Sequence, residues 1–235
     1  MPTLYIAGDS YASISDVQEK GKSWSELLAK SLNADLVNVA RPAASNLSIA
    51  IQTEWISQRI SSDDYVVVML TDHYRETLPN IAVLDNSNKS LLEKHSVHPS
   101  QIPFDNIEYS DPAELVSTLF VDNPAHTDYQ DFFKKWFNPD LVYFKDRMVT
   151  IGSVALLSYK TDKFLVCAGG FANGRDSEKT SLSASDLNIL PKNFCEVTSS
   201  WLLKVSTLTT YINHMDDFTH IQLANLLREK IKNIG

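Results

Sequence analysis

The tripeptide Gly8-Asp9-Ser10 is the first place in the sequence where side chains could carry out a reaction. It directly follows the apolar run from Leu4 to Ala7, which predicts a buried strand that ends in a tight turn. In open α/β folds, ligands bind outside the carboxyl ends of such strands. A serine hydroxyl at that position becomes a nucleophile when a base lies within hydrogen-bond distance. Taken alone, the tripeptide is also typical of an ordinary loop after a strand.

A suitable base stands near the other end of the chain, in the segment Asp217-Phe218-Thr219-His220. Because His220 follows Asp217 by three residues, about one helical turn, the two side chains can face the same way. A carboxylate that holds Nδ1 of an imidazole leaves Nε2 available to take a serine proton. The alternative interpretation is an aspartate that caps a helix and is followed by a surface histidine.

The segments that must position these residues alternate between short apolar runs and amphipathic stretches. Ser23 and Glu26 have the capping-box spacing at the start of one helix, and Asn46 is the expected N-cap of the next. Strands that alternate with helices predict βαβ units and a parallel sheet covered by helices, an α/β fold. We expect strands at residues 4–7, 36–39, 65–70 and 163–168, and helices at 23–32, 46–60, 139–159 and 220–232.

The rest of the chain is less regular. Residues 79–126 are interpreted as a long insertion, for which a cap over the site is one role. Residues 128–137 predict a further helix, residues 171–193 are polar and irregular, and residues 193–206 show no clear period. At 235 residues, the chain is expected to form a single domain, residues 1–235, with one core.

Composition argues against several classes of protein. A formal net charge of −8 argues against a sequence-independent grip on nucleic acid, which needs clustered Lys and Arg. Cys167 and Cys195, the two cysteines, lack the spacing of a zinc site or a disulfide framework. The N-terminus has no signal-peptide pattern, and the sequence has no 18-residue apolar run that predicts a membrane span. The cytoplasm, or a virion assembled there, is therefore the expected location.

Together, the two chemistry-bearing fragments resemble the SGNH (GDSL-like) family of serine hydrolases. That family carries Gly-Asp-Ser after its first strand and Asp-x-x-His just before its last helix, and here these motifs stand at residues 8–10 and 217–220. The resemblance implies a three-layer α/β/α flavodoxin-like sandwich and an esterase that needs no cofactor or metal. It implies Ser10 as nucleophile, His220 as base and Asp217 as the residue that orients His220. A small-molecule or carbohydrate ester is the implied substrate.

The family's oxyanion hole is matched less closely. Ala43 stands where the family has a glycine, and Thr71 replaces the asparagine whose amide binds the oxyanion. With the N–H groups of Ser10 and Ala43 as two donors, Asn46 and Thr71 are the predicted additional ones; the alternative for Asn46 is a plain N-cap. The run from Ala40 to Asn46, followed by Leu70-Thr71 and Arg75, also looks like a branch of the family common in phages.

Two further residues are predicted to contact the substrate, Asp9 and Arg75. Arg75 suits a carboxylate or phosphate group on the substrate, or alternatively an ion pair with Asp72 or Glu76 on the surface. His73 is a weaker rival base, because it has no aspartate at triad spacing.

Two functions of different classes remain open at this point. The first is ester hydrolysis, on an acyl, acetyl or carbohydrate ester, through an acyl-Ser10 intermediate. The second is a degenerate SGNH fold that serves as a non-catalytic binding module or a virion structural module. The departures at positions 43 and 71 favour the second, whereas the presence of Ser10, Asp217 and His220 favours the first.

Overall fold

A parallel β-sheet of five strands forms the centre of the structure, a computed structural model. The structure describes residues 1–13, 21–41, 44–71, 138–169, 193–197 and 215–234, together with the backbone of 77–78 and 116–117. The strand order is β2-β1-β3-β6-β7, and every neighbouring pair is parallel. This order is the flavodoxin-like one. The strands are β1 (Thr3–Ala7), β2 (Asp35–Asn38), β3 (Tyr65–Met69), β6 (Phe164–Gly169) and β7 (Phe194–Val197).

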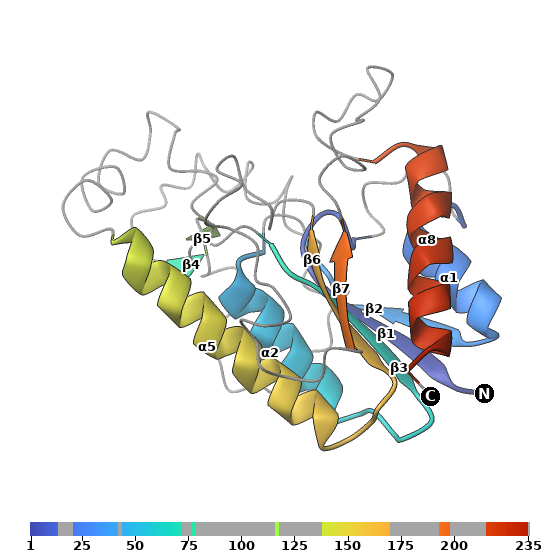
Figure 1. The fold of residues 1–235 in the computed structure, drawn as a ribbon, viewed down its shortest axis with the longest axis horizontal. Helices are drawn as coiled ribbons and strands as arrows, with labels where there is room; N and C mark the ends of the chain where they lie inside the picture. Colours follow the sequence, from blue (N-terminus) through green and yellow to red (C-terminus); the bar gives the residue numbers. More distant parts are fainter. Residues whose placement is uncertain are drawn as a thin grey trace, which may run out of the picture.

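Two pairs of helices cover the sheet, one pair on each face (Figure 1). Helices α1 (Trp24–Leu32) and α8 (Asp217–Lys232) lie side by side on one face, and α2 (Asn46–Ser57) and α5 (Pro139–Ser158) on the other. The structure therefore has the three-layer α/β/α flavodoxin-like architecture that the sequence resemblance implies.

The strand sequences explain why both faces are buried. Successive side chains of a strand point to opposite faces, so Leu4 and Ile6 join the core beneath α1 and α8. Tyr5 and Ala7 join the core beneath α2 and α5. A strand that is covered on both faces has to be apolar throughout rather than alternating.

Most element boundaries follow local signals in the sequence. The capping box of α1 is present: the Ser23 side chain accepts from the Glu26 N–H, and the Glu26 carboxylate accepts from the Ser23 N–H. Helix α8 begins at Asp217, earlier than predicted, because Asp216 caps it. The prediction that Asn46 caps α2 is wrong: Ser45 is the N-cap, and its side chain accepts from the Ser48 N–H.

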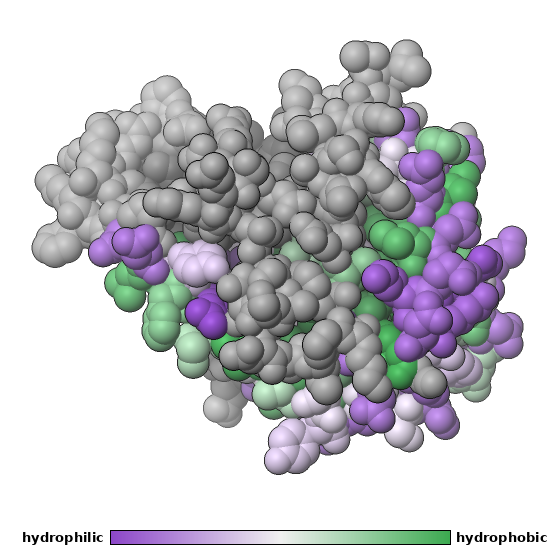
Figure 2. Space-filling view, viewed as in Figure 1, coloured by the Kyte–Doolittle hydropathy of each residue, from purple (hydrophilic) through white to green (hydrophobic). Residues whose placement is uncertain are grey.

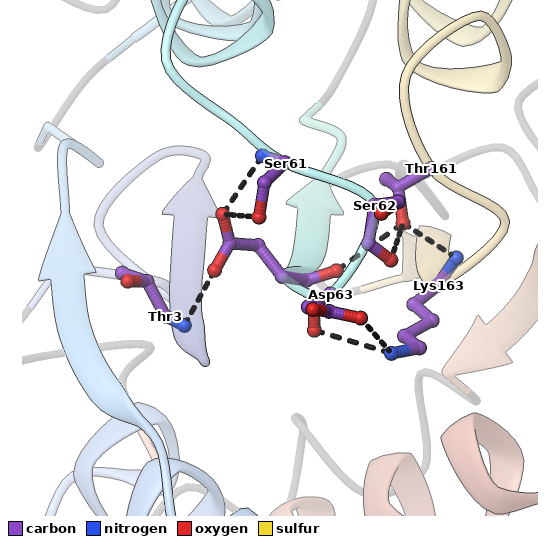
Figure 3. Close-up of polar contacts among 7 residues, drawn as sticks. Thr3, Ser61, Ser62, Asp63, Thr161 and Lys163 are labelled. Carbon is purple, nitrogen blue, oxygen red and sulfur yellow. Dashed lines mark hydrogen bonds and ion pairs between the residues drawn. The ribbon is translucent and has the colours of Figure 1, made fainter. Parts of the chain in front are cut away.

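A polar cluster ties the amino ends of the strands together, at the edge of the sheet opposite Ser10 (Figure 3). The buried Asp64 carboxylate accepts from the Thr3 N–H at 2.7 Å and from the Ser61 N–H and hydroxyl at 2.8 Å each. Thr161 Oγ1 lies 3.2 Å from the Asp64 carbonyl oxygen. These contacts join the beginnings of β1 and β3 to the turn before β6.

The outer surfaces of the two helical layers differ in character (Figure 2). Helix α5 exposes Leu141, Phe144 and Met148, whereas α8 exposes the charged Glu229 and Lys232 towards its end and Phe218 and Ile221 at its beginning. Within the described residues, no helix combines the length and the apolar character needed to cross a membrane. Strands β4 (Thr77–Leu78) and β5 (Val116–Ser117) form a separate antiparallel pair. The rest of the predicted insertion at 79–126, the helix expected at 128–137 and the segment 171–192 lie outside the described residues.

Candidate functional site

The turn that carries Ser10 leaves β1 at the carboxyl end of the sheet, as predicted. Gln52, a buried residue of α2, binds both polar groups of the Gly8 backbone: Oε1 accepts from the Gly8 N–H at 2.8 Å, and Nε2 donates to the Gly8 carbonyl at 3.2 Å. The Arg41 N–H donates to the same carbonyl. Ala12 and Ser13 then donate their N–H groups to the Asp9 carbonyl, which closes the turn around Ser10.

Glycine at position 8 is required by space. A Cβ atom there would lie 2.6 Å from Ala12 Cβ, 3.0 Å from Met69 Cβ and 3.1 Å from the Met69 carbonyl oxygen. The shortest distance is one that real Cβ atoms do not show, and the other two are tight contacts with atoms of Met69 that cannot swing away. The turn after β1 therefore packs directly against the end of β3.

Ser10 itself has a hydroxyl and an N–H that no described residue occupies. Its side chain makes no hydrogen bond with a described residue, and its N–H donates to none of them. The residue is largely buried, with 8% of its surface exposed. An N–H with no acceptor beside a serine hydroxyl is the arrangement that oxyanion binding uses.

Asp9 supports the turn rather than facing the solvent. It is 1% exposed, and Oδ2 accepts from the Thr71 hydroxyl at 2.6 Å while Oδ1 accepts from the Tyr11 N–H at 3.0 Å. The Thr71 hydroxyl hydrogen is thereby used on Asp9. Thus the geometry gives no support to a substrate-binding role for Asp9 or to a donor role for the Thr71 side chain.

Asn46 is committed to structural contacts in the same way. Its Nδ2 group donates to the Thr71 carbonyl at 3.0 Å and to Asp146 Oδ2 at 2.8 Å, and its Oδ1 accepts from the Thr71 N–H at 2.9 Å. A side-chain amide has only two hydrogens, so none remains for an oxyanion. The predicted donor role of Asn46 is not supported by this geometry.

His220 lies in the first turn of α8 and is 6% exposed. Its Nδ1 accepts a hydrogen bond from the backbone N–H of Trp24 at 3.1 Å. The Trp24 indole donates to the carbonyl of Tyr11, the residue after Ser10, at 2.7 Å. Trp24 therefore connects the predicted base with the turn of the predicted nucleophile, although no hydrogen bond joins Ser10 and His220 among the described residues.

The carboxylate predicted to orient His220 points elsewhere in this structure. Asp217 forms an ion pair with Lys22 at 3.2 Å, and its side chain is 65% exposed. Asp216 is the neighbouring carboxylate: the hydrogen bond from the Thr219 hydroxyl holds its pKa below the usual value against the opposing effect of burial, and attraction to His220 contributes. The predicted contact between Asp217 and Nδ1 is not made here.

Two further predictions cannot be placed. Ala43 and Arg75 lie outside the described residues.

Among the described residues, no three His, Cys, Asp or Glu side chains gather closely enough to hold a metal ion. The hydrogen bond with Cys195, together with burial, raises the pKa of the Cys167 thiol, so this thiol on β6 is protonated and unreactive.

Several residues of the site escaped the sequence analysis: Gln52, Trp24 and Asp146. Gln52 stands three residues after Ile49 and four before Ile56, on the buried side of α2, so a polar residue in an apolar stripe was a usable signal. Asp146 interrupts the buried side of α5 in the same way. Nothing in the sequence marks Trp24, because the atom that binds His220 is its backbone nitrogen.

Comparisons with known proteins give matches to structures only. No protein-family model matches the chain, and no curated protein does. The structure of a carbohydrate esterase is similar, with 12% identity and a TM-score of 0.50. The match covers 99% of this chain and 65% of the esterase, so this chain spans less than two thirds of the esterase's length.

Two other solved structures of similar length also match. One is a member of the lipolytic protein G-D-S-L family from Veillonella parvula, with 14% identity, a TM-score of 0.46, and coverage of 99% of this chain and 97% of that one. The other is the psychrotrophic esterase EstA from Pseudoalteromonas sp., with 11% identity, a TM-score of 0.47, and coverage of 99% and 96%. At such identities, the similarity extends to the fold alone. By the match with a TM-score of 0.50, the chain shares its α/β/α fold with a carbohydrate esterase, and its two terminal motifs resemble those of the SGNH-like hydrolases.

Proposed function

We propose that the protein is a serine ester hydrolase that forms an acyl intermediate on Ser10. The observation that carries the proposal is the turn after β1: Gly8 is fixed by Gln52, and Ser10 presents both a hydroxyl and an N–H that bind no described residue. A fixed turn at the carboxyl edge of a parallel sheet is where α/β enzymes bind their ligands. The shared fold with an esterase is consistent with this chemistry.

His220 is the proposed base, and its hydrogen bonding defines a resting state. A neutral imidazole whose Nδ1 accepts a hydrogen bond carries its proton on Nε2. To take the Ser10 proton on Nε2, His220 must instead carry its own proton on Nδ1, next to an acceptor. We propose that Asp217 supplies this acceptor when substrate binds. For this change, Asp217 leaves an exposed ion pair, a type of contact worth about 0–1 kcal/mol, and Nδ1 gives up the hydrogen bond from the Trp24 N–H.

The reaction then follows the acyl-transfer scheme. Ser10 Oγ attacks the ester carbonyl carbon as its proton passes to His220, and the resulting oxyanion binds the N–H groups of Ser10 and Ala43. The carbon–oxygen bond to the leaving alcohol breaks, and the alcohol takes the proton from His220. Water, deprotonated by His220, attacks the acyl carbon. The bond between that carbon and Ser10 Oγ then breaks, Oγ takes the proton back from His220, and the acid is released.

The proposed substrates are acyl or acetyl esters, including esters of carbohydrates. The carbohydrate esterase, with a TM-score of 0.50, supports esters of carbohydrates as one class of substrate. Arg75 remains a proposed contact to the substrate.

Hydrolysis of p-nitrophenyl acetate by the full-length chain tests the proposal. We expect turnover by the wild type and its loss in Ser10→Ala and in His220→Ala, with all three proteins folded. Turnover that survives in Ser10→Ala would overturn the assignment of the nucleophile, and absence of turnover with every short-chain ester would overturn the hydrolase proposal.

A second candidate is a non-catalytic ligand-binding module, which the Trp24 contact favours. With Nδ1 occupied, the Nε2–H of His220 is a hydrogen-bond donor rather than a base. The similar carbohydrate esterase has an active site that displays divergent catalytic and non-catalytic binding functions. If this candidate is correct, the chain binds an acetylated sugar without hydrolysing it. Isothermal titration would then show binding, while an assay for released acetate would show no product.

A further inference from the structure

A buried carboxylate in the middle of α5 is the starting point. Asp146 is 2% exposed, at the contact between α5 and α2, where the two helices lie side by side (Figure 1). Removing a carboxylate from water is unfavourable unless hydrogen bonds compensate. Its Oδ2 accepts from Asn46 Nδ2 at 2.8 Å, a contact between residues 100 positions apart.

Asn46, which binds Asp146, also holds the backbone that follows β3. Its side-chain amide binds both the N–H and the carbonyl of Thr71, at 2.9 and 3.0 Å. Two hydrogen bonds to one residue fix the orientation of the backbone as well as its position. Asn46 is 3% exposed and Thr71 2%, so water does not compete for these groups.

Thr71 in turn holds the turn that carries Ser10. Its hydroxyl donates to Asp9 Oδ2 at 2.6 Å, and Asp9 Oδ1 accepts from the Tyr11 N–H. Ser10 lies between Asp9 and Tyr11, so the two contacts bracket it. Consecutive hydrogen bonds therefore run from α5 through Asn46 and Thr71 to Asp9, the residue before the proposed nucleophile.

We infer that Asp146 is a positioning residue for Ser10, acting through Asn46, Thr71 and Asp9; the inference rests on the proposed hydrolase function. Loss of the Asp146 carboxylate releases one hydrogen of the Asn46 amide and lets that amide turn away from Thr71. The Thr71 hydroxyl then no longer holds Asp9 in place. A nucleophile displaced by about 1 Å can lose about a hundredfold in rate.

The test measures the rate at which a fluorophosphonate labels Ser10, together with kcat, KM and melting temperature. We expect Asp146→Ala to slow labelling and lower kcat by about tenfold to a hundredfold, with KM changed less than about threefold, as loss of positioning without loss of binding predicts. Asp146→Asn keeps an oxygen acceptor for Asn46 and should recover most of the rate.

The matched control is Thr150→Val on the same helix. Thr150 is 2% exposed, and its hydroxyl makes no hydrogen bond with a described residue, so the change is nearly isosteric and should leave the labelling rate unchanged. Thr71→Val breaks the same series of contacts closer to Ser10, so the double variant with Asp146→Ala should be no slower than the slower single variant.

The possible outcomes separate the two proposals. If the wild type labels and Asp146→Ala labels at the same rate, the positioning role is overturned. The role is also overturned if the effects of Asp146→Ala and Thr71→Val add. In both cases the hydrolase proposal still stands. If Asp146→Ala fails to fold, the labelling rate of Thr71→Val decides in its place, and a wild-type rate overturns the role. A wild type that neither labels nor hydrolyses esters would overturn the proposed function and this inference with it.

Discussion

Replacing Gly8 with alanine should be the most damaging single-methyl change in the turn that carries Ser10. The added Cβ would lie 2.6 Å from Ala12 Cβ and close to both the Cβ and the carbonyl oxygen of Met69. Overpacking of a rigid core site costs about 1–3 kcal/mol, and the lack of any movable atom places this site near the upper value. For a chain of this size, about 3 kcal/mol corresponds to a fall of about 6–12 °C in melting temperature.

Differential scanning calorimetry with two further variants makes this prediction specific. Gly152→Ala adds a methyl group to α5 where nothing lies within 4 Å, so it should stabilise the helix by about 0.5–1 kcal/mol. Ala12→Gly in the Gly8→Ala background removes the shortest contact and should restore about half of the lost melting temperature, because the contacts with Met69 remain. A Gly8→Ala protein that melts within about 2 °C of the wild type would refute the close packing of β1 against β3.

Three other predictions concern hydrogen bonds and charge. Asn46→Ala breaks three buried hydrogen bonds and should lower the free energy of unfolding by about 3 kcal/mol. Ser45→Ala removes the adjacent N-cap and should lower it by about 1 kcal/mol. Equal losses in urea melts would contradict the assignment of Ser45 as the cap and Asn46 as the buried hydrogen-bonding residue. Burial of Asp64 raises its pKa, but hydrogen bonds from the neighbouring backbone and Ser61 outweigh this and hold the pKa below the usual value. The stabilising effect of the Asp64 carboxylate is therefore complete above about pH 4 and is lost as the pH falls through the lowered pKa. The melting temperature of Asp64→Asn should therefore fall less in acid than that of the wild type. Parallel acid profiles of the two proteins would count against this role. Asp217→Asn should lower kcat by at least about tenfold with an unchanged melting temperature, because the side chain is exposed; an unchanged kcat would remove Asp217 from the mechanism.

Local signals in the sequence were sufficient for most of the fold. The capping box at Ser23 and the apolar runs of β1 and β3 depend on residues close together in the chain, so their structural meaning can be recognised from a short window. Strand β7 was missed, because it is a four-residue strand at the edge of the sheet and contains a glutamate. The choice between Ser45 and Asn46 as N-cap was undecidable locally, since both residue types cap helices well.

The details of the site depend on contacts that local patterns do not encode. The Asn46 amide is used by partners 25 and 100 residues away, and Nδ1 of His220 binds a backbone N–H 196 residues away. Sequence spacing predicted Ser10 and His220 as catalytic residues, and the structure connects His220 and the turn of Ser10 through Trp24. It could not show that Asp217 faces Lys22, because that depends on how α1 and α8 pack.

The central claim is that Ser10 is a nucleophile, and covalent labelling tests it most directly. Incubation of the folded chain with a fluorophosphonate, followed by intact-mass and peptide mass spectrometry, should show one adduct, located on Ser10. The label should be absent from Ser10→Ala and strongly reduced in His220→Ala. An unlabelled wild type, or an adduct on any other residue, would contradict the account.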